Sequence, residues 1–449
     1  MSGHVVIVGG GLSGLAAGVG LASQGIRTTI LEQKPSPGGR AYSFQDSVTG
    51  DTIDNGQHVL IAGYERTMHF LETIGTRQLL HVQGTPSLTF HHPRRGFQTL
   101  RLSRLHIPFN FLVGVLRCTL FSIPDRLRLV RAGNALRSAA VRDRPRLERE
   151  TVQEWLERAG QSDECIRSFW EPLAVSIMNE KTRKASALVF VRALGNAFLG
   201  GPMSAALAVP SVGLTQLYVE SARRYVTLHG GSLQCNADVV KLHMEGGVAG
   251  GVKLRDDTVV RADAVILTIP PHKLVSVIPP QLYDGMPQLP MIGMSPIVSV
   301  HLWFHTEFMD QESVALIGRR IQWLFNRRLI NREEGKGAHV SAVISGAYDF
   351  VDLTKEELVR IAVEDIRSAY PVLSERPWHS VVIREKSATY SSSPSTESMR
   401  PSTMTPLANV FLAGDWTATG YPATMEGAVL SAEPMWWSTS PPRLASDIR

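Results

Sequence analysis

The stretch VVIVGGGLSGLAAGVGLASQGIRTTILEQ, residues 5–33, decides the fold of this chain. Residues 5–8 form a short apolar run of β-branched character, as a buried parallel strand requires. A helix rich in alanine and leucine is predicted over residues 12–23, and Gly25 ends it. A second strand is predicted over residues 28–31. Strand, helix and strand in this order predict an α/β fold with a Rossmann-like parallel sheet.

Three glycines between the first strand and the helix have the G-x-G-x-x-G spacing of a dinucleotide-binding turn. Gly9 permits the tight turn, Gly11 lets a pyrophosphate approach the backbone, and Gly14 lets the helix pack closely on the strand. Glu32 ends the second strand, where an acid binds ribose hydroxyls. The predicted cofactor contacts of this unit are Gly9, Gly11, Leu12, Ser13, Gly14, Glu32 and Gln33.

A second segment, VFLAGDWTATGYPATMEGAVLS at residues 410–431, is typical of a flavin cradle. Its glycine lets a pyrophosphate come near, and the following carboxylate can accept hydrogen bonds from ribityl hydroxyls. A helix is predicted from about residue 423, with its N-terminus directed at the flavin ring, where it stabilises the anionic reduced state. The predicted contacts of this segment are Gly414, Asp415, Thr424 and Met425.

The length of the chain and the distribution of its charges limit the possible domain organisation. Its 449 residues suit two interleaved domains, and the net charge of +5 is mild. Residues 94–149, however, hold thirteen arginines, no lysine and three acids. Within them, the apolar stretch of residues 105–123 is interrupted by Pro108, Asn110 and Arg117, so it does not read as a membrane span. The pattern favours a surface that lies on an anionic membrane. A solvated basic face is the alternative. Nucleic-acid binding is disfavoured, because aromatic residues are not interleaved as stacking platforms.

The cysteines and the N-terminus indicate the compartment. Cys118, Cys165 and Cys235 have no spacing typical of a metal site, and none lies in the C-terminal cradle, so any flavin should be held non-covalently. The first core strand begins at Val5, which leaves no room for a signal peptide. We therefore expect a cytoplasmic protein, peripheral on the inner face of the cytoplasmic membrane.

The motif Gly38-Gly39-Arg40 separates FAD from NAD, because it resembles the GGR motif of the flavin amine oxidase and phytoene desaturase superfamily. That resemblance implies that Gly39 and Arg40 contact FAD, and that the backbone at Val239 touches adenine. It also implies an FAD-binding domain of the flavin amine oxidase type interleaved with an α+β substrate-binding domain. The expected FAD-binding domain comprises residues 1–85, 211–285 and 400–449, and the expected substrate-binding domain comprises residues 86–210 and 286–399.

Two further segments narrow the resemblance. Residues 54–58 (DNGQH), followed by Tyr64, and residues 169–173 (FWEPL) are similar to the hydroxysqualene dehydroxylases, also called squalene-associated FAD-dependent desaturases. The resemblance covers essentially the whole chain and adds Gly56, Gln57 and His58 to the expected cofactor contacts. It implies a bacterial enzyme of hopanoid and triterpenoid precursor synthesis. The implied reaction is removal of the allylic hydroxyl of hydroxysqualene to give squalene, by loss of water and hydride transfer from reduced flavin N5.

Such a reaction needs a proton donor near the hydroxyl and an apolar pocket that excludes water. His58 is the first candidate donor because its ordinary pKa lies in the useful range; Asp54 could orient it or act instead, and Tyr64 and Glu171 are further candidates. The hydrophobic C30 isoprenoid substrate would arrive from a bilayer or from an upstream squalene-pathway synthase. No second dinucleotide fingerprint is evident, so a reductase, free reduced flavin and a quinone-linked donor all stay open as the source of electrons.

Three other functions fit parts of the pattern. A carotenoid or phytoene-type desaturase would run the flavin oxidatively, and an amine oxidase would need an aromatic cage. A non-catalytic isoprenoid-lipid carrier on the same fold, of the GDP-dissociation-inhibitor kind, need not keep a complete cradle. The glycines, Glu32 and Asp415 are all in place here, which favours catalysis.

Overall fold

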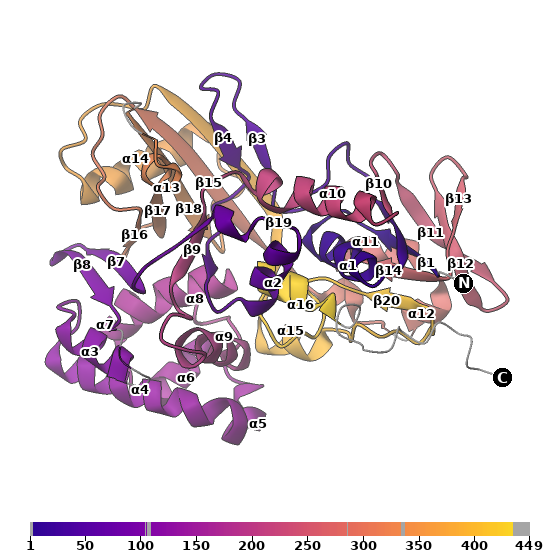
Figure 1. Ribbon diagram of the computed structural model, residues 1–449. Helices are drawn as coiled ribbons and strands as arrows, with labels where there is room; N and C mark the ends of the chain where they lie inside the picture. Colours follow the sequence, from indigo (N-terminus) through magenta and orange to yellow (C-terminus); the bar gives the residue numbers. More distant parts are fainter. Residues whose placement is uncertain (1–2, 104, 106–108, 285, 334–336, 434–449) are drawn as a thin grey trace.

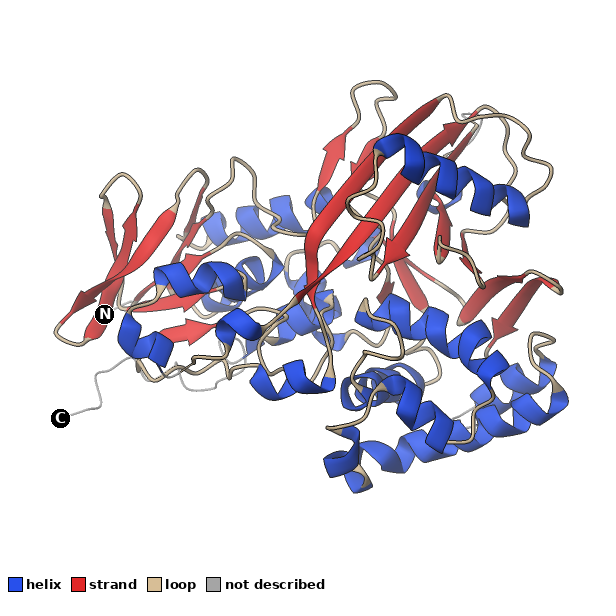
Figure 2. Ribbon diagram, turned by 180° about the vertical axis from the view of Figure 1, so that it is seen from behind, coloured by secondary structure: helices blue, strands red, loops and turns tan. Residues whose placement is uncertain are grey.

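The computed structural model describes residues 3–433 except 104, 106–108, 285 and 334–336. Pro108 lies outside this part of the chain, as does Pro434, which the sequence predicts to end the last helix. Figures 1 and 2 show a five-stranded sheet flanked by helices at one end of the molecule, a seven-stranded sheet at the other, and a layer of helices below the latter. The mixed α/β architecture that the sequence predicts is confirmed.

The five-stranded sheet is parallel at every pairing and has the order β10-β2-β1-β14-β20. Its strands come from distant parts of the chain: β1 (His4–Val8), β2 (Arg27–Leu31), β10 (Ser232–Gln234), β14 (Ala264–Leu267) and β20 (Val410–Leu412). Helices α1 (Leu12–Ser23) and α10 (Glu220–Leu228) pack together on one face, where Leu15 and Val226 are fully buried. The glycine turn that follows β1 and the segment that follows β20 thereby lie at the same side of the sheet, where the carboxyl ends of its parallel strands meet.

The seven-stranded sheet has the order β19-β15-β18-β17-β16-β7-β8. Its strands are β7 (Ser87–His92), β8 (Gly96–Arg101), β15 (Met294–Phe304), β16 (Ser313–Leu316), β17 (Trp323–Asn326), β18 (Ala338–Ser345) and β19 (His379–Tyr390). Helix α14 (Lys355–Ala369) begins at a Thr354–Glu357 capping box and packs its apolar side on this sheet. On the opposite face of the sheet, Trp323, Phe325 and Val343 line a cavity.

The layer of helices lies between residues 109 and 199. It contains α3 (Phe109–Arg117), α4 (Ile123–Arg142), α5 (Arg144–Leu147), α6 (Val152–Arg158), α7 (Asp163–Cys165), α8 (Glu171–Met178) and α9 (Ala187–Leu199). The amphipathic pattern of residues 152–159 predicts a helix with Thr151 as its N-cap, and the structure confirms this cap, since the Thr151 side chain accepts a hydrogen bond from the backbone N–H of Glu154. Among the described residues we find no helix with the length and apolar character of a membrane span.

Smaller elements complete the two ends of the molecule. They are β3 (Ser43–Gln45), β4 (Thr52–Asp54), β5 (Leu60–Ile61), α2 (Glu65–Thr73), β6 (Leu80–Val82), β9 (Leu207–Pro210), β11 (Val239–Glu245), β12 (Val248–Leu254), β13 (Val259–Arg261), α11 (Pro271–Val277), α12 (Pro280–Asp284), α13 (Arg327–Asn331), α15 (Pro394–Met399) and α16 (Met425–Leu430). Short 3-10 segments occupy residues 77–79 and 289–291, and π-helical turns occupy residues 166–170 and 215–219.

Three local expectations need correction. The sequence predicts one helix over residues 213–228, but a π-helical turn of residues 215–219 precedes α10. The sequence predicts a strand over residues 232–242, but the structure divides it: β10 pairs with β2, whereas β11 joins the separate β11-β12-β13 sheet. The last helix begins at Met425 rather than near residue 423, because the side chain of Thr424 caps it. The exact limits of the two expected domains stay a prediction.

Candidate active site

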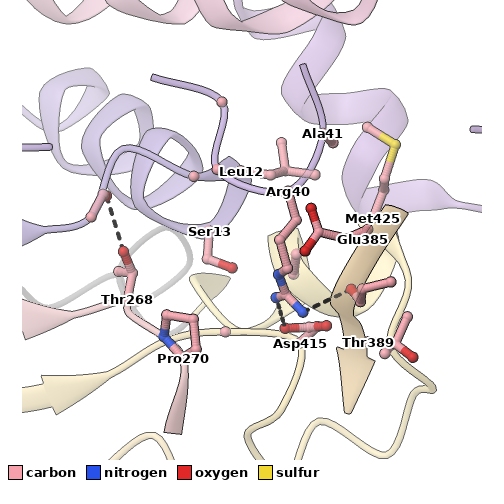
Figure 3. Close-up of a pocket in the computed structure, with 18 of the residues that line it drawn as sticks. Leu12, Ser13, Arg40, Ala41, Thr268, Pro270, Glu385, Thr389, Asp415 and Met425 are labelled. Carbon is pink, nitrogen blue, oxygen red and sulfur yellow. Dashed lines mark hydrogen bonds and ion pairs between the residues drawn. The ribbon is translucent and has the colours of Figure 1, made fainter. Parts of the chain in front are cut away.

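A cavity of about 690 Å³ runs from the glycine turn of β1 and α1 to the seven-stranded sheet. Segments far apart in the sequence line it, and Figure 3 shows part of this lining around Arg40 and Asp415. The sequence-predicted residues that line it are Gly9, Gly11, Leu12, Ser13, Glu32, Gln33, Gly39, Arg40, Gly56, Gln57, His58, Tyr64, Val239, Gly414, Asp415, Thr424 and Met425. The structure therefore brings both cofactor segments and the DNGQH loop to a single cavity.

The glycine turn has backbone geometry that a side chain would disturb. Gly9 has φ +110°, and a Cβ there would lie 2.6 Å from Oγ1 of Thr268. That hydroxyl donates to the carbonyl oxygens of Val8 and Gly9, at 2.9 and 3.0 Å, which fixes the turn to the neighbouring strand β14. A Cβ at Gly14 would overlap the carbonyl oxygen of Gly9, so Gly14 packs α1 against the turn without lining the cavity itself.

The GGR loop rests directly on this turn. The Gly38 N–H donates to the Gly10 carbonyl oxygen at 2.8 Å. Gly39 has φ +64°, and a Cβ on it would lie only 2.9 Å from the Cα of Gly11. The two loops therefore meet backbone to backbone at the N-terminus of α1, where the N-cap Gly11 has no side chain to occupy the first N–H groups of the helix.

Glu32 is held rigidly at the end of β2. Its carboxylate accepts hydrogen bonds from the backbone N–H groups of Gly10, at 2.8 Å, and Lys34, at 2.9 Å. The side chain is buried and borders the cavity beside Gln33. A carboxylate fixed in this way presents its remaining lone pairs in one direction, as recognition of paired hydroxyls requires.

Arg40 and Asp415 join the two predicted cofactor segments by a partly buried ion pair, in which 31% of the Arg40 side chain and 7% of the Asp415 side chain are exposed. Nη2 of Arg40 lies 2.5 Å from Oδ1 of Asp415, and Nη1 donates to the Ala388 carbonyl oxygen at 3.0 Å (Figure 3). Burial, the largest single effect, acts to lower the pKa of Arg40, but the charge and hydrogen bond of Asp415 and the charge of Glu385 together raise that pKa above its ordinary value. Glu385 of β19 also faces this guanidinium, so carboxylates from two segments surround it.

His58 is held in one tautomer. Its Nδ1 lies 2.8 Å from the carbonyl oxygen of Gly56, which can only accept, so Nδ1 carries the proton. Burial lowers the pKa of His58, and this exceeds the opposing effects of the Gly56 carbonyl and of Asp54. The ring is consequently neutral near pH 7, with the lone pair of Nε2 available as an acceptor.

Tyr64 lines the cavity next to the C-terminal segment. Burial, reinforced by Glu426, raises the pKa of Tyr64, so its hydroxyl stays protonated. The Glu426 carboxylate itself turns away to α2, where it accepts hydrogen bonds from the backbone N–H groups of Arg66 and Thr67 and from the Thr67 hydroxyl. Glu426 thus caps one helix from another.

The two remaining candidates lie outside the cavity lining. Asp54 is buried, accepting hydrogen bonds from the Ser43 hydroxyl at 2.7 Å and the Leu214 N–H at 3.0 Å. Glu171 begins α8 and accepts a hydrogen bond from the Thr182 N–H at 3.0 Å. Among the described contacts, no hydrogen bond joins either carboxylate to His58 or Tyr64, although the charge of Asp54 is near enough to act on the pKa of His58.

Beyond His58 the lining becomes apolar and comes largely from the substrate-side elements. These wall residues are Val59, Ile177, Ile297, Trp323, Phe325 and Val343. No motif in the sequence marks any of them. The sequence of residues 296–350 predicts a strand-rich region, but strand-like character does not reveal which face of a sheet meets a cavity.

Comparison with known proteins places the chain in a family. The family model described as flavin containing amine oxidoreductase matches residues 12–433. The chain belongs to this family. It is therefore an oxidoreductase, and the family implies a flavin cofactor. A match over nearly the whole chain agrees with a cavity built from both ends of it.

Individual relatives are more specific. A hydroxysqualene dehydroxylase of Sinorhizobium fredii is 28% identical over 438 residues, covering 95% of this chain and 96% of that protein. One from Rhodopseudomonas palustris is 28% identical over 444 residues, covering 96% and 97%. A 15-cis-phytoene desaturase of Synechococcus elongatus is 24% identical, covering 96% and 94%. An oxidoreductase of known structure from Methanosarcina mazei shares the fold, with a TM-score of 0.75 and 16% identity over 96% of this chain and 99% of that one.

Proposed function

We propose that this oxidoreductase binds FAD non-covalently and removes the allylic hydroxyl of hydroxysqualene to give squalene. The observation that carries the proposal is one continuous cavity with two chemically different parts. Backbone-rich loops surround one part, and the other has the apolar walls Val59, Ile177, Ile297, Trp323, Phe325 and Val343. A similarity to hydroxysqualene dehydroxylases over 95–96% of the chain supports this substrate class.

The residues present fit FAD. The uncapped N-terminus of α1 and the glycine backbones beside it suit a pyrophosphate, because no side chain stands between those N–H groups and the cavity. Glu32 would take the ribose hydroxyls and Val239 would lie against adenine. Arg40, Asp415 and the residues around Thr424 would hold the remaining part. When bound and reduced, the flavin supplies the hydride that replaces the substrate hydroxyl.

The apolar walls would keep bulk water from the allylic carbon while its hydroxyl leaves as water. The leaving oxygen needs one proton, and His58 is the group best placed to handle it. Because neutral His58 presents Nε2 as an acceptor, it would first receive a hydrogen bond from the substrate hydroxyl. It donates only in its protonated form, which burial disfavours, so acid conditions should favour this step. Tyr64, with its proton retained, would complete the polar rim of the chamber.

We also propose that the substrate enters from a membrane surface at α3 and α4. Four large apolar side chains there are strongly exposed: Phe109, Leu116, Ile123 and Leu127. Arg101, Arg117 and Arg131 are exposed close by in the sequence, which suits anionic lipid headgroups. Val115 and Leu129, on the inner sides of these helices, belong to the same apolar cluster as the chamber residues Trp323 and Phe325. Apolar packing is thus continuous from this surface to the chamber.

The second candidate activity is a phytoene-type desaturation. It is favoured by the similarity to phytoene desaturases over 96% of the chain and by the accepting state of His58. A direct comparison separates the two. FAD-loaded protein would be incubated in liposomes with hydroxysqualene under reducing conditions, or with phytoene and a quinone as oxidant, and the extracted lipids analysed. Squalene from the first reaction alone supports our proposal, and a desaturated product from the second alone contradicts it.

A further inference from the structure

A buried guanidinium reaches the loop that carries His58 from the seven-stranded sheet. Arg327 is the first residue of α13, and only 2% of its surface is exposed. Its Nη1 donates to Oε1 of Gln57 at 2.8 Å, and its Nη2 lies 3.5 Å from Oδ2 of Asp54. One planar cation therefore contacts both ends of the turn formed by residues 54–57.

The ion pair uses the carboxylate oxygen that is turned toward it. Oδ1 of Asp54 already accepts hydrogen bonds from the Ser43 hydroxyl and the Leu214 N–H. Oδ2 faces Arg327, and both side chains are almost completely buried, with 3% and 4% of their surfaces exposed. Removing one partner of such a pair leaves an uncompensated buried charge, so the two groups hold each other in place.

The second contact leads to the cavity. Gln57 receives the Arg327 hydrogen bond on its oxygen, and its Nε2 donates to the carbonyl oxygen of His58 at 3.4 Å. Gln57 and His58 both line the cavity. On the other side of the loop, Asn55 donates to the carbonyl oxygen of Arg40 at 3.0 Å and accepts from the Tyr42 N–H. The loop is thus held from the cofactor side by Asn55 and from the sheet side by Arg327.

The backbone that presents Arg327 is itself fixed. The side chain of Asn326, at the end of β17, accepts hydrogen bonds from the Arg328 and Leu329 N–H groups and donates to the Met309 carbonyl oxygen at 2.7 Å. The guanidinium consequently projects from a capped helix start on a sheet rather than from a free loop. A group held in this way can transmit position to its partners.

We propose that Arg327 is a positioning residue that fixes the loop of residues 54–58, and through it the His58 ring, against the cavity. The catalytic part of this inference rests on the proposed function, since His58 must act on the bound substrate. The positional part does not, because the environment of the His58 ring can be measured without substrate. Two more buried histidines, His301 and His339, also face the Arg327 charge and would respond to its loss.

The neighbouring Arg328 offers a matched control. It belongs to the same helix and is also buried, but its guanidinium binds both oxygens of Asp51, at 3.0 and 2.8 Å, and Glu333. No contact of Arg328 with residues 54–58 is among those that the structure describes. A purely structural role for Arg327 predicts similar behaviour for the two arginines, whereas the positioning role predicts a difference at His58.

The test compares FAD-loaded wild-type protein with Arg327→Gln and Arg328→Gln. The measurements are the melting temperature, kcat and KM for hydroxysqualene, and the titration of His58 followed by NMR. We expect Arg327→Gln to lower kcat by about 10- to 100-fold with a smaller change in KM, as misplacement of a reacting group does. The titration midpoint of His58 should rise, since Asp54 loses its countercharge. Arg328→Gln should change the melting temperature alone.

Each outcome decides the proposal. If Arg327→Gln does not fold, Arg327→Lys replaces it: the charge is kept and the fork is lost, so kcat should still fall while the His58 titration stays near that of wild type. If wild type does not turn over hydroxysqualene, the proposed function fails, and the NMR titration still decides the positioning role. The proposal is overturned if Arg327 and Arg328 variants give the same kcat and the same His58 titration.

Discussion

At the scale of single residues, the protonation state of His58 decides how a hydroxyl could leave. The imidazole is neutral because burial lowers its pKa from an ordinary 6.5, and its only proton is committed to the Gly56 carbonyl. A neutral, accepting ring can orient a substrate hydroxyl but cannot protonate it. The same residue therefore changes from acceptor to donor as the pH falls.

This gives a pH dependence with a definite sign. A lowered pKa means that the protonated, donating form is scarce at neutral pH and increases on acidification. If His58 is the donor, kcat/KM for hydroxysqualene should rise by up to about tenfold per pH unit as the pH falls from neutrality toward that pKa. Steady-state rates between about pH 8 and pH 5.5 would measure it. His58→Gln, which cannot titrate, should give a flat profile; a wild-type rate that is flat or falls on acidification rules His58 out as donor.

The contact between the two glycine loops makes a second prediction at this scale. An alanine at Gly39 would be strained at φ +64° and would press against the Cα of Gly11. Gly39→Ala should thus separate the loops and weaken flavin binding, so that the purified variant is paler and releases FAD on gel filtration. Gly50→Ala is the matched control, because Gly50 has φ +74° but open space around it. Equal flavin content in both variants would contradict a cofactor role for the loop contact.

At the scale of elements, the structure separates what the sequence could and could not predict. The unit from β1 to β2 was predictable because its signal is local: strand, glycines, helix and acid follow one another without interruption. The contact of Arg327 with Gln57 was not, because 270 positions separate the two residues and nothing in the sequence around Arg327 marks it. The same holds for the apolar chamber, since an alternating strand does not reveal which element will cover which face.

The packing of α16 on α2 gives a stability prediction. Glu426 caps the start of α2 with three hydrogen bonds of 2.7–3.0 Å and is 2% exposed. Glu426→Ala leaves those buried donors unpaired and should lower the free energy of unfolding by about 2–3 kcal/mol. Denaturant unfolding would measure the loss. Glu433→Ala, which removes only a partly exposed ion pair with Arg66, should cost less than about 1 kcal/mol; equal losses would contradict the capping role.

The exposed apolar side chains of α3 and α4 allow a test of the proposed membrane contact. Phe109→Ser combined with Ile123→Ser and Leu127→Ser should reduce cosedimentation with anionic liposomes several-fold, because each removed side chain gives up about 1.5–3 kcal/mol of burial when fully inserted. Leu228→Ser with Val372→Ser is the control, since these apolar side chains are also more than half exposed but lie outside α3 and α4. If both sets of variants sediment as wild type does, α3 and α4 do not form the membrane contact.

At the scale of the whole molecule, the cavity is assembled from parts that do not form a site alone. The five-stranded sheet supplies the glycine turn and Glu32, the C-terminal segment supplies Asp415, and the seven-stranded sheet supplies most of the apolar wall residues. Two ion pairs cross between these parts: a partly buried one joins Arg40 to Asp415, and a buried one joins Arg327 to Asp54. A cofactor and a substrate that both fill this cavity would therefore tie the two ends of the molecule together.

The most direct test of this account is a single turnover without oxygen. FAD-loaded protein would be reduced chemically and mixed with hydroxysqualene in liposomes, while the flavin absorbance is followed and the lipids are extracted at the end. We predict that the flavin is reoxidised as one equivalent of squalene forms per flavin consumed. A flavin that stays reduced while hydroxysqualene is recovered intact would contradict the proposed reaction.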